Sequence, residues 1–145
     1  MKKILPVLIG IFLSASCTTT SMAISDIKFE AHECFGVCPI FDMTIHSDGA
    51  ASYYAMQFNK LKGQFKTTLN KAKIDSINML LGKADFFRLN NKYTTLLTDQ
   101  PTYVLTVRLK NGQTKTIVDY GPRGPEKLKD VYKFLFSLRD SQNWK

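Results

Sequence analysis

Two cysteines separated by three residues are the side chains of this sequence best suited to chemistry. They lie in the segment Cys34-Phe35-Gly36-Val37-Cys38-Pro39. An extended chain would hold Cα atoms four residues apart about 13 Å from one another, whereas a disulfide needs roughly 4.4–6.8 Å between them. A bond between Cys34 and Cys38 therefore requires a tight turn, which Gly36 permits, and an oxidising compartment favours that bond. We predict a structural disulfide that fixes a bend in the chain.

The same cysteines support an alternative hypothesis, a thiol or metal function. Their spacing, followed by Pro39, resembles that of exported copper chaperones of the Sco type. Two thiolates together with the imidazoles of His32 and His46 would form a ligand set suited to copper or zinc. However, catalytic cysteine pairs usually enclose two residues and not three, and the βαβ pattern of a thioredoxin-like fold is missing. We therefore expect no cofactor and no metal, and keep this ligand set as the alternative.

Three further side chains, Tyr93, Asp99 and Tyr120, are candidates to line a groove for a small ligand. Asp99 lies two residues before Pro101 in a polar segment, where an aspartate typically accepts hydrogen bonds from turn amides. A carboxylate in such a segment can also act as a general base, so a hydrolase organised around Asp99 is a second alternative. No serine lies in a nucleophile elbow and no glycine-rich phosphate loop is present. The sequence therefore predicts no catalytic set.

The first 23 residues have the three parts of a secretory signal: a cationic start, an uncharged apolar run over residues 4–13, and a tract of small residues. The apolar run is about half of the roughly 20 residues that a helix needs to cross a bilayer. A cut after Ala23 would release residues 24–145, whereas a lipoprotein peptidase would cut after residue 16 and leave Cys17 to carry lipid. We predict an exported protein, periplasmic or an outer-membrane lipoprotein, with a signal over residues 1–23 or 1–16.

The charge of the chain is that of an ordinary soluble surface. The formal net charge is +8, and it falls by the two charges of Lys2 and Lys3 to +6 when the signal is removed. The remaining lysines are scattered, which is typical of solvated faces. Export argues against nucleic acid as a partner, so we expect an unknown envelope protein or an anionic surface instead. The mature chain of about 120 to 128 residues suits a single domain, over residues 24–145.

Alternation of apolar and polar residues predicts six strands, over residues 27–32, 41–46, 50–58, 63–69, 102–110 and 113–120. Two of the connections carry turn signals, Asp48-Gly49 and Asn111-Gly112. These hairpins favour an antiparallel sheet.

Helical spacing of apolar residues predicts two helices. The first covers residues 71–88 after a cap at Asn70. The second begins at Pro125, and its buried stripe contains Leu128, Val131, Leu135 and Leu138. The predicted fold is α+β in the order ββββαββα, an antiparallel sheet of about six strands with two helices packed on one face.

An ordered set of short motifs resembles a known family. The set contains residues 34–41 (CFGVCPIF), Asp48-Gly49, Tyr54, residues 84–89 (ADFFRL), Tyr93, residues 98–102 (TDQPT), Lys115-Thr116 and Asp119-Tyr120. Together these resemble the uncharacterised bacterial exported family called domain of unknown function 6438, across about residues 25–144. The chain departs from the family pattern at Phe41, where a tyrosine is common, and at residues 121–124, where a shorter turn is usual. The resemblance implies no activity, so we expect a non-enzymatic binding or structural module of the cell envelope.

Overall fold

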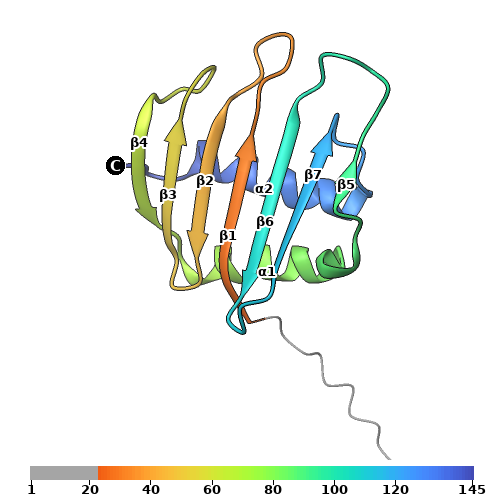
Figure 1. Ribbon diagram of the computed structural model, residues 1–145. Coiled ribbons are helices and arrows are strands. Elements are labelled where there is room, and N and C mark those ends of the chain that lie inside the picture. The colour runs from red at the N-terminus through yellow and green to blue at the C-terminus, as the bar shows by residue number, and fades with distance from the viewer. Residues whose placement is uncertain (1–22) are drawn as a thin grey trace, which may run out of the picture.

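The computed structural model describes residues 23–145, which form one sheet with helices on one side (Figure 1). The strands are β1 (Ile24–Ala31), β2 (Phe41–His46), β3 (Ala50–Ala55), β4 (Gly63–Thr68), β5 (Lys92–Tyr93), β6 (Thr102–Leu109) and β7 (Thr114–Tyr120). The helices are α1 (Lys71–Lys83) and α2 (Glu126–Ser141), and a short 3-10 helix, η1 (Phe86–Arg88), follows α1.

The seven strands lie in the order β4-β3-β2-β1-β6-β7-β5. Neighbouring strands are antiparallel except β5 and β7, which are parallel. Both helices cover the same face of the sheet, and the other face is open (Figure 1). The predicted α+β architecture and the order ββββαββα are confirmed, with one strand more than the expected six.

The additional strand, β5, lies within residues 90–101, a polar segment for which the sequence predicts a loop and no strand. It has only two residues, which pair with Val118 and Asp119 of β7, and two residues are too few to show an alternation. Lys115 of β7 fixes the segment just before β5. Its Nζ donates to the carbonyl oxygen of Leu89 at 2.6 Å and to Oδ1 of Asn91 at 2.7 Å. A lysine contact across 24 or more residues leaves no local sequence signal.

Helix α1 begins as predicted and ends earlier than predicted. The side chain of Asn70 caps its start by accepting a hydrogen bond from the Lys73 amide at 3.0 Å. The helix ends at Lys83 because Asp85 adopts a left-handed conformation with a φ of +48°, which no α-helix can accommodate. The chain then turns into η1, and this turn buries the Phe86 side chain completely.

The hydrophobic core lies between the sheet and the helices. Phe29 of β1 is fully buried at its centre, with its ring centroid 5.5–5.7 Å from those of Phe41, Tyr103, Tyr132 and Phe136. All four residues of the predicted α2 stripe are buried: Leu128, Val131, Leu135 and Leu138. Burying one such side chain stabilises the fold by about 1.5–3 kcal/mol, so this stripe fixes α2 on the sheet.

The two predicted turns use glycine in the conformations that favour it. Gly49 has a φ of +92°, and a Cβ atom at this position would lie 2.5 Å from the carbonyl oxygen of Leu69. Gly112 in the second turn has a φ of +88°. Both hairpins therefore form where the sequence predicts them.

The strand directions gather three loops at one end of the sheet. These loops connect β1 to β2, β3 to β4 and β5 to β6, whereas β1 begins at the opposite end (Figure 1). Within residues 23–145, no helix has the length and apolar character needed to cross a bilayer. The chain therefore presents two distinct ends, one with these loops and one where the described chain starts.

Candidate functional site

The loop between β1 and β2 is closed by a disulfide between Cys34 and Cys38, whose Cα atoms are 5.8 Å apart. This is the pairing predicted from the sequence. Inside the ring, the Gly36 amide donates a hydrogen bond to the Cys34 carbonyl oxygen at 2.9 Å. Within the ring, the Phe35 and Val37 side chains are 87% and 80% exposed. Closing so short a loop contributes about 2 kcal/mol to stability.

The loop between β5 and β6 lies beside this ring. The Phe35 amide donates a hydrogen bond to the Asp99 carbonyl oxygen at 3.3 Å, which joins the two loops. Leu96 and Leu97, a few residues before Asp99, are both exposed, and Leu96 completely so. Two apolar loop tips are thus held next to each other by a backbone contact.

The loop between β3 and β4 is joined to the segment that follows the disulfide ring. The Asn59 side chain donates to the Ile40 carbonyl oxygen at 2.7 Å and accepts from the Tyr53 hydroxyl at 2.9 Å. Because Tyr53 is a core residue, this pair of bonds fixes the loop to the sheet. The loop exposes Phe58, which has a φ of +57°, and Leu61.

We call the six exposed apolar side chains of these loops the apolar rim: Phe35, Val37, Phe58, Leu61, Leu96 and Leu97. They are six of the eight large hydrophobic side chains exposed in residues 23–145, the other two being Tyr54 and Met79. Scattered exposed apolar residues need no explanation, whereas apolar residues gathered on three neighbouring loops are where an interaction surface is sought. The rim is therefore the candidate functional site.

The sequence profile of one protein family, described as a domain of unknown function (DUF6438), matches residues 25–139. The chain belongs to this family. Among the curated proteins, none matches the chain. The matched range begins in β1 and ends in α2, so it contains all three loops of the apolar rim. Membership in the DUF6438 family thus agrees with the predicted resemblance and leaves the activity open.

The three residues predicted to line one ligand groove do not face each other in this DUF6438 chain. Tyr93 pairs with Asp119 and shares its helix-covered face of the sheet. Tyr120 follows Asp119 in β7, so its side chain lies on the opposite face. There its hydroxyl accepts a hydrogen bond from the backbone amide of Gln100 at 3.3 Å. Asp99 belongs to the neighbouring loop and is exposed. The structure therefore separates Tyr93 from the other two.

The alternative metal ligands are also placed apart. Cys34 and Cys38 are bonded to each other, so neither offers a thiolate. His32 follows the end of β1, whereas His46 pairs with Asp26 near its beginning. His46 Nδ1 lies 2.5 Å from the Asp26 carboxylate, and hydrogen bonds from Ser25 and then from His46 hold the pKa of Asp26 below its usual value. No group of three or more ligating side chains meets within residues 23–145.

Asp99, the candidate base of the hydrolase hypothesis, is engaged with its own neighbour. Its carboxylate accepts a hydrogen bond from the Thr98 hydroxyl at 3.0 Å, where the sequence predicted turn amides. Its backbone adopts a φ of +64°, and its carbonyl oxygen receives the Phe35 amide. The residue thus contributes to the loop geometry beneath the apolar rim. Cys17, the predicted lipidation site, lies outside the described residues.

Sequence reasoning missed the role of Asp119, which is the one charged residue fully buried in residues 23–145. Its carboxylate accepts from the Arg123 amide at 2.6 Å and from the Gly124 amide at 3.0 Å. Burial, and after it the nearby Asp119 carboxylate, raise the pKa of Tyr132 and of Tyr103 above the usual value. The sequence signal was an aspartate at an inward strand position, shortly before a turn with two glycines, whose residues Arg123 and Gly124 lie four and five positions after it.

Proposed function

We propose that this chain is a non-enzymatic, exported module of the cell envelope that docks a partner protein on its apolar rim. The observation that carries the proposal is the gathering of six of the eight exposed large apolar side chains in three adjacent loops. Exposed apolar groups of this kind lose unfavourable contact with water when a partner covers them. The export part of the proposal is supported by the signal pattern of the first 23 residues.

Contacts within the chain restrict the rim loops. The disulfide, the Phe35–Asp99 backbone bond and the Asn59 bonds to Ile40 and Tyr53 restrict all three loops. Loops that are already restricted lose less conformational entropy on binding. A rigid scaffold with binding residues on its loops is a common arrangement for recognition.

A protein partner fits the rim better than a lipid bilayer does. The same loops carry exposed carboxylates at Glu33 and Asp99 and exposed ammonium groups at Lys60 and Lys62. Apolar side chains surrounded by charges of both signs resemble a protein interface, with an apolar centre and a polar rim. Carboxylates beside the inserting residues would be repelled by an anionic membrane surface.

The test is site-specific photo-crosslinking of the full chain in its native envelope. A photoreactive phenylalanine analogue replaces Val37 in one variant, Leu97 in a second and Met79 in a third. Met79 is the matched control, because it is an exposed apolar residue on α1, outside the rim. We expect both rim positions to give an adduct with the same protein and Met79 to give none.

A further substitution separates docking from chance proximity. Phe35→Ser should reduce the adduct at Leu97 about tenfold, as removal of a buried aromatic anchor does at protein interfaces, whereas Met79→Ser should leave it unchanged. Equal adducts from Met79 and the rim would refute the proposal. Membrane binding would replace the proposal if two results came together. The purified chain would float with anionic vesicles, and Phe35→Ser would not, while neither rim position gave a protein adduct.

A further inference from the structure

The open face of the sheet has two halves that differ in how their polar side chains are used. On β1, β6 and β7, the polar groups mostly bond to each other or to the end of β2: Lys28 Nζ to Glu30 at 2.9 Å, Asp26 to His46 at the end of β2, and Thr106 to Thr116 at 2.9 Å. These internal bonds satisfy the groups that make them. Apart from the exposed Arg108 guanidinium, that half of the face therefore offers few free donors or acceptors.

The other half, on β2, β3 and β4, has two rows of polar side chains beyond His46. Asp42, Tyr54 and Gln64 form one row across the three strands, since Asp42 pairs with Tyr54 and Tyr54 with Gln64. Thr44, Ser52 and Lys66 form the next row in the same way. We call these six residues the Tyr54 patch. Within residues 23–145, the side chains of Asp42, Tyr54, Gln64 and Lys66 make no hydrogen bond.

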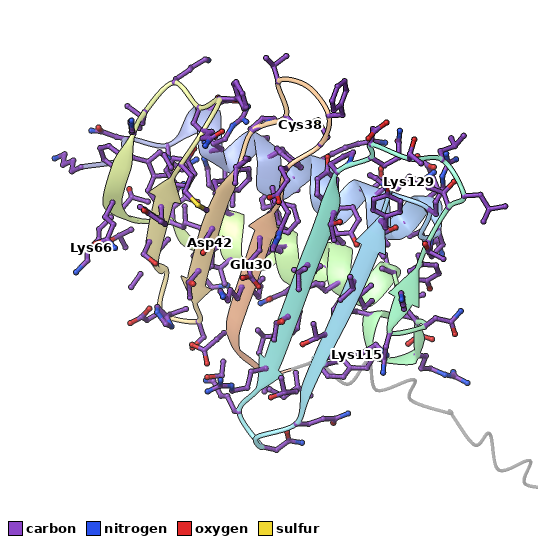
Figure 2. The ribbon with its side chains drawn as sticks, turned by 45° about the horizontal axis from the view of Figure 1, so that its top comes forward. Glu30, Cys38, Asp42, Lys66, Lys115 and Lys129 are labelled. Carbon is purple, nitrogen blue, oxygen red and sulfur yellow. A yellow bond between two sulfur atoms is a disulfide. The ribbon has the colours of Figure 1, made fainter. Side chains whose placement is uncertain are left out.

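The Tyr54 patch is hollowed and carries an aromatic ring at its centre. All six of its residues line a shallow hollow of about 390 Å³, together with Tyr53, Phe65 and Lys145. Lys145 is held there by two backbone hydrogen bonds to Lys66, at 2.7 and 3.0 Å. The Tyr54 side chain is 45% exposed, and Figure 2 shows Asp42 on the face turned away from the helices. A ring with free polar groups on both sides is thus open to solvent.

These groups match the chemistry of a sugar. The apolar face of a sugar ring can stack on an aromatic side chain, and its hydroxyls both donate and accept hydrogen bonds. Asp42 supplies an acceptor, Lys66 supplies donors, and the Gln64 amide supplies both. One carboxylate and one ammonium leave the patch without net charge, which suits an uncharged ligand better than an anionic one.

The acetamide of an N-acetylated sugar fits the same groups. It has one N–H donor for the Asp42 carboxylate and one carbonyl acceptor for Gln64 or Lys66. Burial, and after it the nearby Glu30 carboxylate, raise the pKa of Asp42, so a donor placed there would relieve an unsatisfied acceptor. Figure 2 shows Glu30 and Asp42 close together on the open face.

We propose that the Tyr54 patch binds a glycan of N-acetylated sugars, with one sugar ring stacked on Tyr54. We assign the glycan to the cell wall because the proposed function places the protein outside the cytoplasm. The recognition of the sugar itself does not depend on that proposed function. The site is separate from the apolar rim, because it lies on strand centres of the open face and not on the loops.

The test is a titration of the purified chain, residues 24–145 with the disulfide intact, with chitotetraose, the β-1,4-linked tetramer of N-acetylglucosamine. Amide shifts in two-dimensional ¹H–¹⁵N spectra report the binding site. We expect saturable shifts confined to β2, β3 and β4. Tyr54→Ala should weaken binding about tenfold or more, whereas Tyr54→Phe should retain it because the stacking ring remains. Gln64→Ala should also weaken binding.

Two controls fix the interpretation. Thr116→Ala changes the open face outside the patch, and Phe35→Ser changes the apolar rim; both should bind chitotetraose like the original chain. If Phe35→Ser loses partner docking but still binds the sugar, the two surfaces act separately. The proposal is overturned by an absence of shifts at millimolar sugar, by shifts on β6 and β7 only, or by unchanged binding of the folded Tyr54→Ala variant.

Discussion

Tyr53 connects the core of the protein to the candidate docking surface through one side chain. Its ring is 2% exposed and packs with the Trp144 ring at a centroid distance of 5.1 Å. Its hydroxyl donates to Asn59, the residue that holds the β3–β4 loop. A polar tip on a buried aromatic ring usually finds such a partner. Here the partner is a loop residue, so the position of the rim depends on the core.

This buried phenol predicts a loss of stability at alkaline pH. Burial raises the pKa of Tyr53 to about 12, whereas the phenol of an unfolded chain ionises near 10. Between these values the unfolded state binds fewer protons than the folded state, so stability is complete below pH 10 and falls as pH rises towards 12.

The measurement is urea unfolding at several pH values between 8 and 12. Tyr53→Phe should lower stability by about 1 kcal/mol at pH 8, because the bond to Asn59 is lost. The variant should then lose less stability than the original chain as pH rises. A parallel decline in the two proteins would show that the Tyr53 phenol does not contribute to the pH dependence.

At the scale of elements, a buried carboxylate fixes the connection between β7 and α2. Asp119 accepts the two amides of Arg123 and Gly124 in the turn that leads into the helix. A Cβ atom on Gly124 would lie 2.9 Å from Asp119 Oδ2 and 2.6 Å from Leu128 Cδ2. The turn therefore packs closely against both the strand and the first buried residue of α2.

Removal of this carboxylate should destabilise the whole domain. Asp119→Ala leaves two amides without their partner, one of them buried, and hydrogen bonds to charged groups contribute about 1.5–3 kcal/mol each. We expect a loss of about 3 kcal/mol or more in urea unfolding at pH 7. Asp75→Ala on α1 is the control, because its exposed bridge to Lys71 should contribute less than about 1 kcal/mol. Equal effects of the two substitutions would contradict the role assigned to Asp119.

The sequence predicted some elements better than others. The well-predicted elements depend on residues that are adjacent in sequence, and the others depend on distant ones. The β6–β7 hairpin was predictable because its alternation and its Asn111-Gly112 turn are adjacent in sequence. The last turn of the predicted first helix was wrong, since apolar spacing continues through Phe86 while the backbone breaks at Asp85. Strand β5 was missed because it forms only through pairing with β7.

The candidate site was predictable only in part for the same reason. The cysteine spacing predicted the disulfide, which depends on five consecutive residues. The apolar rim combines three loops that are distant in sequence and are joined by Asn59 and by the Asp99 carbonyl oxygen. The Tyr54 patch likewise depends on the register of β2, β3 and β4. No local pattern contains that information.

At the scale of the whole molecule, the two proposed surfaces and the start of the described chain point in different directions. The apolar rim lies at one end of the sheet, the Tyr54 patch on the open face, and β1 begins at the other end (Figure 1). Cys17 precedes Ile24 by seven residues, a length that spans at most about 25 Å. A lipid on Cys17 would attach the protein at the end away from the rim, which leaves the rim accessible to a partner.

This arrangement predicts the effect of Cys17→Ser on the location of the protein. If lipid on Cys17 is the anchor, the original chain should incorporate a clickable palmitate analogue and sediment with membranes, whereas Cys17→Ser should lose the label and become soluble. A variant with Cys34→Ser and Cys38→Ser should keep the label, because only Cys17 precedes the folded domain. N-terminal sequencing decides between the two cuts: a mature chain that starts at Ile24 would exclude lipid anchoring, and the rim would then act in a freely diffusing protein.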